Sequence, residues 1–455
     1  MTNKQGVVVN IGFDDIDSPQ GGCTTHFVSE LIIKWSKKPW VEFIDYPNLI
    51  RLAPGVPWKT RGNGGLVVRV RVPDEEKAFD LYEEAVVEVE NYVREFMHPE
   101  SHPALAMVVG YPDKTLEWLG HKAVQDIIPK DLLLRVIDKI TNLHKDTRIR
   151  GYRGLVGAYA SIGVTLRDSD YTYELIAYRK PEYWGKPRLV DPLSVKNMDL
   201  ALKGKTFLNY DHEVDKPLIT PHGPDPVLFG IRGEEPEYLV EALRMIHVLE
   251  PIDMWIIYRT NQATDMHLRQ ITSLNEAYIY TGIRIIATVY SQPRRIRGGH
   301  VVFKITDNTR ELDVAAYEPT GGFRNIVEKL IPGDIVEVYG IIRPPSSNHG
   351  PTLNLEKIRI IKLAPRYKYV APRCPRCSAR MESMGRGKGY RCKKCGYKDP
   401  NAKKIAIPLP RDVTPGFYQP PPRSFKHLMK PIERFGREKK EPPKRLYVPW
   451  YWKSS

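Results

Sequence analysis

The chain has 455 residues, of which 42% are hydrophobic, and its formal net charge is +15. That length fits about three or four domains, and that apolar content excludes wholesale disorder. The longest apolar runs fall far short of the ~20 residues of a transmembrane helix, and the N-terminus lacks a secretory signal pattern. We therefore expect a cytoplasmic protein with no membrane partner.

The excess positive charge lies in the last fifth of the chain. Residues 1–365 hold 45 basic and 48 acidic side chains, whereas residues 366–455 hold 24 basic and 6 acidic ones. A nearly neutral body with a strongly basic end favours an enzyme whose C-terminal part binds a polyanion.

Residues 1–145 are predicted to form an α/β or α+β domain. A buried strand over 7–13 leads through a polar loop to a helix that ends near Trp35. A strand over 66–72, an amphipathic helix over 75–96 and a buried strand over 104–110 follow.

An acidic loop follows the first strand directly. Asp14, Asp15 and Asp17 repel one another unless a cation or hydrogen bonds offset their charge. Carboxylate oxygens suit Mg²⁺, which binds through one or two carboxylates together with substrate phosphates. The alternative is an ordinary polar turn between a strand and a helix.

Two glycine-containing segments are candidate phosphate-binding loops. Gly21 and Gly22 lead into a helix that begins near Thr24, where backbone N–H groups are placed to bind phosphate oxygens. The second segment contributes Lys59, Arg61, Asn63 and Gly64 immediately before a strand. Each alone is weak, because such segments are often only helix caps or turns.

Residues 146–275 are predicted to form a ferredoxin-like domain with two helices on one sheet. The segment begins with Arg153-Gly154-Leu155-Val156-Gly157. Strands over 172–178, 227–232 and 254–258 and a helix over 236–249 follow. A polar cluster at the end of the last strand includes Asn261, Asp265 and His267, for which a capped turn is an equal alternative.

Residues 280–365 are predicted to form an oligonucleotide/oligosaccharide-binding (OB) barrel. Five short strand-like runs occur there, with a helical stretch over 323–330 between the third and fourth. Residues 366–405 carry four cysteines, and residues 406–455 read as a basic, proline-rich extended tail.

The four cysteines are predicted to form a zinc ribbon. Cys374 and Cys377 make one Cys-x-x-Cys pair, and Cys392 and Cys395 make the other. Two such pairs complete a tetrahedral site, and four thiolates leave no open position for catalysis, so the zinc is structural. The surrounding basic residues favour nucleic-acid binding, with a solvated basic face as the alternative.

Taken together, these motifs resemble the archaeal tRNA(isoleucine) agmatinylcytidine synthetase (TiaS) family. The resemblance covers nearly all of residues 1–400, although Ala263 stands where glycine is expected and Ile16 where threonine is common. It implies a multidomain α+β fold: an atypical ATP-dependent kinase-like domain, a ferredoxin-like domain, an OB fold and a C-terminal zinc ribbon. It also implies cleavage of ATP to AMP, agmatine as co-substrate, and autophosphorylation of Thr24.

The function expected from this resemblance is replacement of the C2 oxygen of the wobble cytidine in a CAU-anticodon isoleucine tRNA by agmatine. A phosphorylated cytidine is the expected intermediate, because phosphate leaves readily where oxygen does not. Asp265, or another carboxylate at the domain junction, is the expected partner of the agmatine guanidinium. Two alternatives are a non-enzymatic nucleic-acid-binding protein and another ATP-dependent RNA kinase or ligase.

Overall fold

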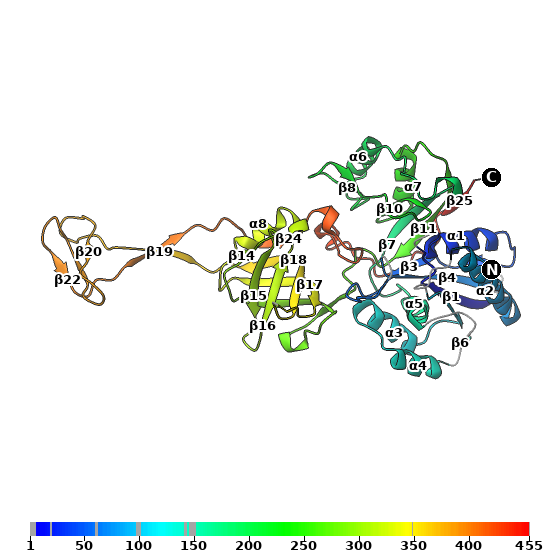
Figure 1. The fold of residues 1–455 in the computed structure, drawn as a ribbon, viewed down its shortest axis with the longest axis horizontal. Helices are drawn as coiled ribbons and strands as arrows, with labels where there is room; N and C mark the ends of the chain where they lie inside the picture. The colour runs from blue at the N-terminus through cyan, green and yellow to red at the C-terminus, as the bar shows by residue number, and fades with distance from the viewer. Residues whose placement is uncertain are drawn as a thin grey trace.

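The protein consists of an α/β body, a β-barrel and a small ribbon arranged in a row. The computed structural model describes residues 6–18, 21–59, 62–96, 102–140, 143–144, 152–347 and 349–454. Figure 1 shows the ribbon at one end, the barrel in the middle and the body at the other end, where both chain termini lie.

The body is built on one ten-stranded sheet. Its strands are β1 (Val7–Asp14), β2 (Glu42–Phe43), β3 (Asn48–Arg51), β4 (Gly64–Val72), β5 (Ala104–Val109), β6 (Leu143–His144), β7 (Thr172–Arg179), β10 (Val227–Gly233), β11 (Ile252–Thr260) and β25 (Tyr451–Lys453). The strand order is β10-β7-β11-β3-β4-β1-β5-β6, and β2 and β25 pair with β4 and β11. Because β11 pairs in parallel with β3, the kinase-like and ferredoxin-like segments share one sheet and one hydrophobic core. The division at residue 145 stays a prediction.

Helices cover both faces of the N-terminal strands. They are α1 (Thr24–Trp35), α2 (Glu75–Phe96), α3 (Lys114–Gln125), α4 (Lys130–Lys139) and α5 (Tyr152–Gly163). Side chains alternate along β1: Phe13 packs on Phe27 of α1, whereas Gly12 faces Ala158 of α5. The helix α5 therefore closes the face of the sheet opposite α1.

The ferredoxin-like part adds α6 (Pro192–Ala201) and α7 (Pro236–Met245), with the small strands β8 (Tyr210–Asp211) and β9 (Lys216–Pro217). The predicted helix over 236–249 is wrong at its end. After Met245 the chain becomes extended, because Val248 bridges to Val190 and the carbonyl oxygen of His247 accepts a hydrogen bond from Asp191.

The barrel confirms the predicted five strands. They are β13 (Gly282–Val289), β15 (Val301–Thr306), β16 (Glu311–Ala316), β17 (Ile335–Arg343) and β18 (Thr352–Lys362). The sheet runs β13-β17-β18-β16-β15 and closes through a β13–β15 pairing. The helix α8 (Phe323–Glu328) lies between the third and fourth strands, as in the expected OB fold.

The ribbon stands on a two-stranded stalk. Strand β19 (Arg366–Val370) leaves the barrel and pairs with the returning β23 (Ile405–Leu409). Between them lie the three short strands of the ribbon, β20 (Glu382–Ser383), β21 (Tyr390–Arg391) and β22 (Lys398–Asp399). The ribbon is therefore an insertion at the tip of a hairpin, far from the body in Figure 1.

The tail has little regular structure, as predicted, but it returns to the body. Its strand β24 (Gly416–Tyr418) pairs with β18, and β25 adds to β11, where Trp450 is buried. Seven tail cations form ion pairs with carboxylates of the barrel and body: Arg411, Arg423, Lys426, Lys430, Arg434, Lys439 and Lys453. The charge of the tail therefore largely neutralises acidic groups of the protein itself, and polyanion binding by the C-terminal part stays a prediction.

The fold class is the multidomain α+β architecture that the sequence predicted. In the part of the chain that the structure describes, no helix combines the length and apolar character needed to cross a membrane.

Candidate functional site

A large cavity lies between the N-terminal and ferredoxin-like parts of the body. Its volume is about 990 Å³. One side is formed by the end of β1, the start of α1 and the loop before β4, and the other by β7, β10 and the loop over residues 218–225. Both sequence motifs from residues 1–145 therefore face one space.

The predicted acidic loop lines this cavity. Burial and then the neighbouring Asp15 raise the pKa of Asp14 well above its ordinary value. Burial and Asp17 raise the pKa of Asp15 to about 6, although a hydrogen bond from the His102 backbone opposes the rise. Within the described residues, Oδ1 of Asp15 is buried without a hydrogen-bond partner. Such carboxylates gain from a bound cation, so the residues fit Mg²⁺.

Asp17 holds the start of α1. Its Oδ1 accepts a hydrogen bond from the Thr24 N–H at 3.2 Å, and its Oδ2 accepts one from the Thr24 hydroxyl at 3.2 Å. The same hydroxyl accepts a hydrogen bond from the Ile16 N–H at 3.1 Å. Ile16 makes this contact through its backbone, so the unexpected side chain leaves it intact. Thr24 is thus held at the cavity wall by two elements of the acidic loop.

The glycines of the Arg153–Gly157 segment hold α5 against the acidic loop. A Cβ atom on Gly157 would stand 1.6 Å from Oδ2 of Asp14. One on Gly154 would likewise meet the carbonyl oxygen of His102. These positions need glycine because the helix backbone approaches the acidic side chain and its neighbouring strand directly.

The predicted cationic loop lies on the same cavity. Lys59, Asn63 and Gly64 line it, and Asn63 donates to the carbonyl oxygen of Ala53 at 2.9 Å. Burial and the charges of Arg343 and Lys426 lower the pKa of Lys59. Arg61 lies outside the described residues.

Of the two glycines before α1, one lies at the cavity. Gly22 lines the cavity, whereas Gly21 is not among its lining residues. Gly21 and Gly22 have φ values of 152° and 42°, which favour glycine. A side chain at either position would also meet the ring of Phe96.

Several cavity residues were not predicted from the sequence. Arg51 and Glu174 face each other with an Arg51 Nη2–Glu174 Oε2 distance of 3.8 Å, and Arg232 contacts the other oxygen of Glu174. Within the described residues, Nε of Arg51 is buried without a hydrogen-bond partner. These side chains lie on strands outside any recognisable sequence motif, so the sequence did not identify them. The cavity therefore offers a buried cation opposite a cluster of carboxylates.

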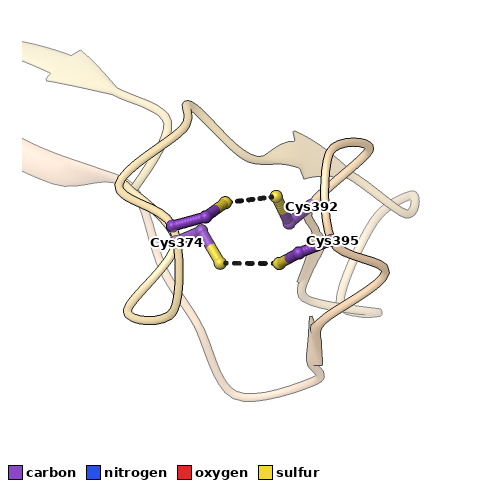
Figure 2. A group of neighbouring side chains, drawn as sticks. Cys374, Cys392 and Cys395 are labelled. Atoms are coloured by element: carbon purple, nitrogen blue, oxygen red, sulfur yellow. Dashed lines mark hydrogen bonds between the residues drawn. The ribbon is translucent and has the colours of Figure 1, made fainter.

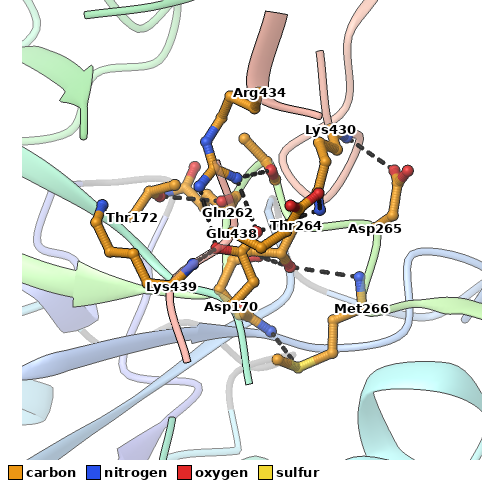
Figure 3. Close-up of polar contacts among 12 residues, drawn as sticks. Asp170, Thr172, Gln262, Thr264, Asp265, Met266, Lys430, Arg434, Glu438 and Lys439 are labelled. Atoms are coloured by element: carbon orange, nitrogen blue, oxygen red, sulfur yellow. Dashed lines mark hydrogen bonds and ion pairs between the residues drawn. The ribbon is translucent and has the colours of Figure 1, made fainter. Parts of the chain in front are cut away.

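The third predicted cluster does not line the cavity. Asn261 accepts a hydrogen bond from the Arg51 N–H at 2.7 Å and donates to the Arg51 carbonyl oxygen at 2.9 Å, so it fixes the end of β3. Asp265 is engaged by the Lys357 ammonium and the Lys430 N–H, and Figure 3 shows it directed toward Lys430. His267 is buried against Glu356 at 2.9 Å. Asp265 and His267 therefore join the body to the barrel and the tail.

Ala263 keeps the backbone shape expected of glycine. Its φ is 57°, in the left-handed region that costs a non-glycine residue about 1–3 kcal/mol. The surrounding contacts hold it there, because its N–H donates to the His427 carbonyl oxygen and its carbonyl oxygen accepts from Arg434.

The four cysteines converge within the ribbon. Their sulfur atoms all lie within 4.8 Å of one another. The sulfur atoms of Cys374 and Cys395 are 3.4 Å apart, as are those of Cys377 and Cys392, and Figure 2 shows the pair of Cys374 and Cys395. Thiolates about 2.3 Å from one tetrahedral zinc lie at about this separation. Across the described residues, this is the one cluster of at least three potential ligands found close enough for a shared ion. The cysteines fit structural zinc.

Comparisons with known proteins match the whole organisation. Family models described as the TiaS TCKD domain, the TiaS FLD domain, an OB-fold nucleic acid binding domain and the TiaS C-terminal zinc ribbon domain match residues 10–147, 152–267, 283–361 and 371–413. The 2-agmatinylcytidine synthetase TiaS of Staphylothermus marinus, named for the second isoleucine tRNA, is 56% identical over 441 residues, which cover 96% of each chain.

Two solved complexes share the fold. A crystal structure of TiaS with that isoleucine tRNA and ATP is similar with a TM-score of 0.81 at 37% identity. A crystal structure of TiaS with the same tRNA, AMPCPP and agmatine is similar with a TM-score of 0.80 at 35% identity. Each match covers 94% of this chain and 97% of the other.

Proposed function

Because the chain belongs to the TiaS family of isoleucine-tRNA 2-agmatinylcytidine synthetases, we propose that it joins agmatine to the wobble cytidine of the CAU-anticodon isoleucine tRNA at the expense of ATP. It is an ATP-dependent ligase that cleaves ATP to AMP. A cytoplasmic location belongs to the same proposal, since the substrate is a tRNA.

The cavity between the two parts of the body is the observation that carries this function. It brings Asp14, Asp15, Asp17 and Thr24 to one space with Lys59 and Arg51. Phosphoryl transfer needs positioning and charge stabilisation more than covalent chemistry, and these groups supply both signs of charge. An inert binding module has no use for buried, mutually repelling carboxylates.

Asp14 and Asp15 would hold Mg²⁺, which neutralises charge on the transferring phosphate when it is bound. Lys59, Asn63 and Gly64 face the cavity on the side where phosphate oxygens would bind, and Gly22 lies at the start of α1. Asp17 accepts the hydrogen bond of the Thr24 hydroxyl, so it is placed to take that proton if Thr24 is phosphorylated. We also assign Gly21 and Arg61 to ATP binding, as their sequence motifs predict.

Agmatine carries a guanidinium and an ammonium, so its pocket needs carboxylates. Asp265 does not line the cavity, because Lys357 and Lys430 hold it at the junction with the barrel and the tail. Glu174 and Asp225 of the ferredoxin-like part do line it. We assign the agmatine cation to these two carboxylates, with Asn261 and His267 supporting the surrounding backbone.

The tRNA is held by the barrel and the ribbon in this account. Residues 366–405 carry 13 basic and 2 acidic side chains, and Figure 1 shows the ribbon far from the body. Such an arm suits the phosphate backbone of an RNA whose anticodon loop enters the cavity, where the target base is splayed out of its stack.

The assay follows labelled agmatine into a transcript of the CAU-anticodon isoleucine tRNA with ATP and Mg²⁺. The expected result is incorporation that requires all three components and is lost in Asp14→Asn. RNA binding without ATP turnover would identify a binding protein instead. ATP turnover on the tRNA that ignores agmatine would identify another RNA kinase or ligase.

A further inference from the structure

The stalk of the ribbon exposes apolar side chains to solvent. Tyr367 and Tyr369 of β19 are 47% and 62% exposed, and Ile405 and Ile407 of β23 are 49% and 44% exposed. A two-stranded hairpin is at best marginally stable in water by itself, and contiguous exposed apolar surface marks interaction sites. The stalk is therefore a candidate contact surface as well as a spacer between the barrel and the ribbon.

The two faces of the stalk differ in their chemistry. The register pairs Tyr367 with Pro408, Lys368 with Ile407 and Tyr369 with Ala406. Residues directly opposite each other share a face of the sheet, and successive residues alternate between the faces. Both tyrosines therefore lie on one face, opposite two short side chains that leave the rings uncovered. Lys368 and Ile407 lie on the other face.

The spacing of the two tyrosines suits a nucleobase. Residues two apart along a strand are separated by about 6.6–6.8 Å. This is about twice the 3.4 Å separation of successive stacked bases, so one base fits between two rings that stand on the same face. Tyrosine rings stack on any base, because every base has a π face.

The charge of the stalk favours a nucleic acid as the partner of this face. Residues 366–370 and 403–409 contain four basic side chains and no acidic one: Arg366, Lys368, Lys403 and Lys404. Tail cations such as Arg434 differ, since they pair with carboxylates of the protein itself. Exposed aromatic rings beside cations form the kind of platform on which unpaired nucleotides stack.

The position of the stalk indicates which part of the tRNA it meets. Figure 1 shows β19 beyond the barrel, on the side away from the body that contains the cavity. We propose that Tyr367 and Tyr369 stack on an unpaired nucleotide of the tRNA outside its anticodon arm, an inference that rests on the proposed function. The rings hold an unstacked base, whereas the cations of the ribbon contact phosphates.

Binding of the labelled full-length tRNA to the whole protein tests this contact. The double variant Tyr367→Ala/Tyr369→Ala should bind about 5- to 150-fold more weakly, the range that stacking on one base contributes. The double variant Tyr367→Phe/Tyr369→Phe keeps both rings and should bind within about twofold of wild type. Ile407→Ala is the matched control, because it removes an exposed apolar side chain from the opposite face of the same stalk. Zinc content should be the same in all four proteins.

Two further measurements separate stacking from charge and locate the contact. The double alanine variant should keep the wild-type slope of log affinity against log salt concentration, because stacking releases no counterions. It should also bind the isolated anticodon stem-loop as tightly as wild type does. Wild-type affinity for the full tRNA would overturn the proposal, and so would a flatter salt slope, an equal loss on the stem-loop or an equal loss in Ile407→Ala.

The binding measurement needs neither ATP nor agmatine, so it can fail separately from the proposed function. A protein that binds tRNA through the two tyrosines but attaches no agmatine would refute the proposed reaction and leave the stacking contact standing. A protein that attaches agmatine with unchanged tRNA affinity in the double alanine variant would refute the stacking contact alone. Wild-type protein that does not bind this tRNA would overturn both.

Discussion

Gly157 of α5 lies directly against the carboxylate of Asp14, with no room between them for a methyl group. The contact joins a helix of the second sequence segment to the acidic loop of the first. It fixes where Asp14 points.

Gly157→Ala is therefore expected to displace Asp14 and α5 from each other. Overpacking of this kind costs about 1–3 kcal/mol of stability, and a displacement of about 1 Å at a catalytic group lowers the rate about 10²-fold. Thermal unfolding and agmatine attachment measure the two effects. Gly322→Ala is the control, since a Cβ atom there meets nothing within 4 Å. Equal behaviour of the two variants would contradict the packing argument.

Arg434→Ala should destabilise the body and release the tail. The substitution leaves Asp170 and Glu234, whose side chains are 10% and 7% exposed, without their main cation. Loss of one partner from such a buried cluster costs about 3–5 kcal/mol. Denaturant unfolding should show this loss, whereas the exposed Arg437→Ala should change stability by at most about 0.5 kcal/mol. A small effect of Arg434→Ala would mean that the tail is not an integral part of the body.

The junction of barrel, body and tail should be sensitive to acid through Glu356. Burial raises the pKa of this carboxyl. The combined effect of Lys426 and His267 is larger and opposite, so the pKa falls to about 2. A lowered pKa adds stability that is complete above the unfolded value near 4.5 and is lost as the pH falls toward 2. Glu356→Gln should therefore destabilise strongly at pH 7 and progressively less below pH 4.5. The exposed Glu441→Gln is the control, and a pH-independent difference would refute the linkage.

The ribbon can be removed without the tail, because the two ends of its stalk lie next to each other. The Arg411 guanidinium donates to the Ala364 carbonyl oxygen at 2.8 Å, so residues 364 and 411 are neighbours. Replacing residues 366–409 with a short linker should weaken tRNA binding and its salt dependence while preserving thermal stability and ATP binding.

Truncation after residue 365 should behave differently, since it also removes β25, Arg434 and His427 and should lower the stability of the body. Identical stability of the excised and truncated proteins would show that the docked tail contributes nothing. Zinc content supplies a further check: it should fall in Cys392→Ser and remain one ion per chain in Cys23→Ala.

Local patterns predicted much of the fold. The helix over residues 75–96 and the five barrel strands follow from periodicity and turns within short stretches of sequence. The acidic and cationic loops were found for the same reason, since each carries its charges within a few consecutive residues. The polar cluster around Asp265 was recognised, but its residues face the barrel and the tail, which periodicity does not reveal.

What the sequence did not predict depends on contacts between distant segments. In the sequence, Arg51 and Glu174 look like ordinary strand residues. Only the fold brings β3 and β7 to the same cavity. The partners of the docked tail could not be identified from the sequence, because its charges and aromatic residues contact segments spread over the whole chain.

Mass spectrometry of nucleosides from the CAU-anticodon isoleucine tRNA, after incubation with the protein, ATP, Mg²⁺ and agmatine, tests the central claim most directly. We predict that agmatine replaces the C2 oxygen of the wobble cytidine with the wild-type protein and that Asp14→Asn, although folded, leaves this cytidine unchanged. An unmodified cytidine with the wild-type protein, or equal modification by Asp14→Asn, would contradict the account.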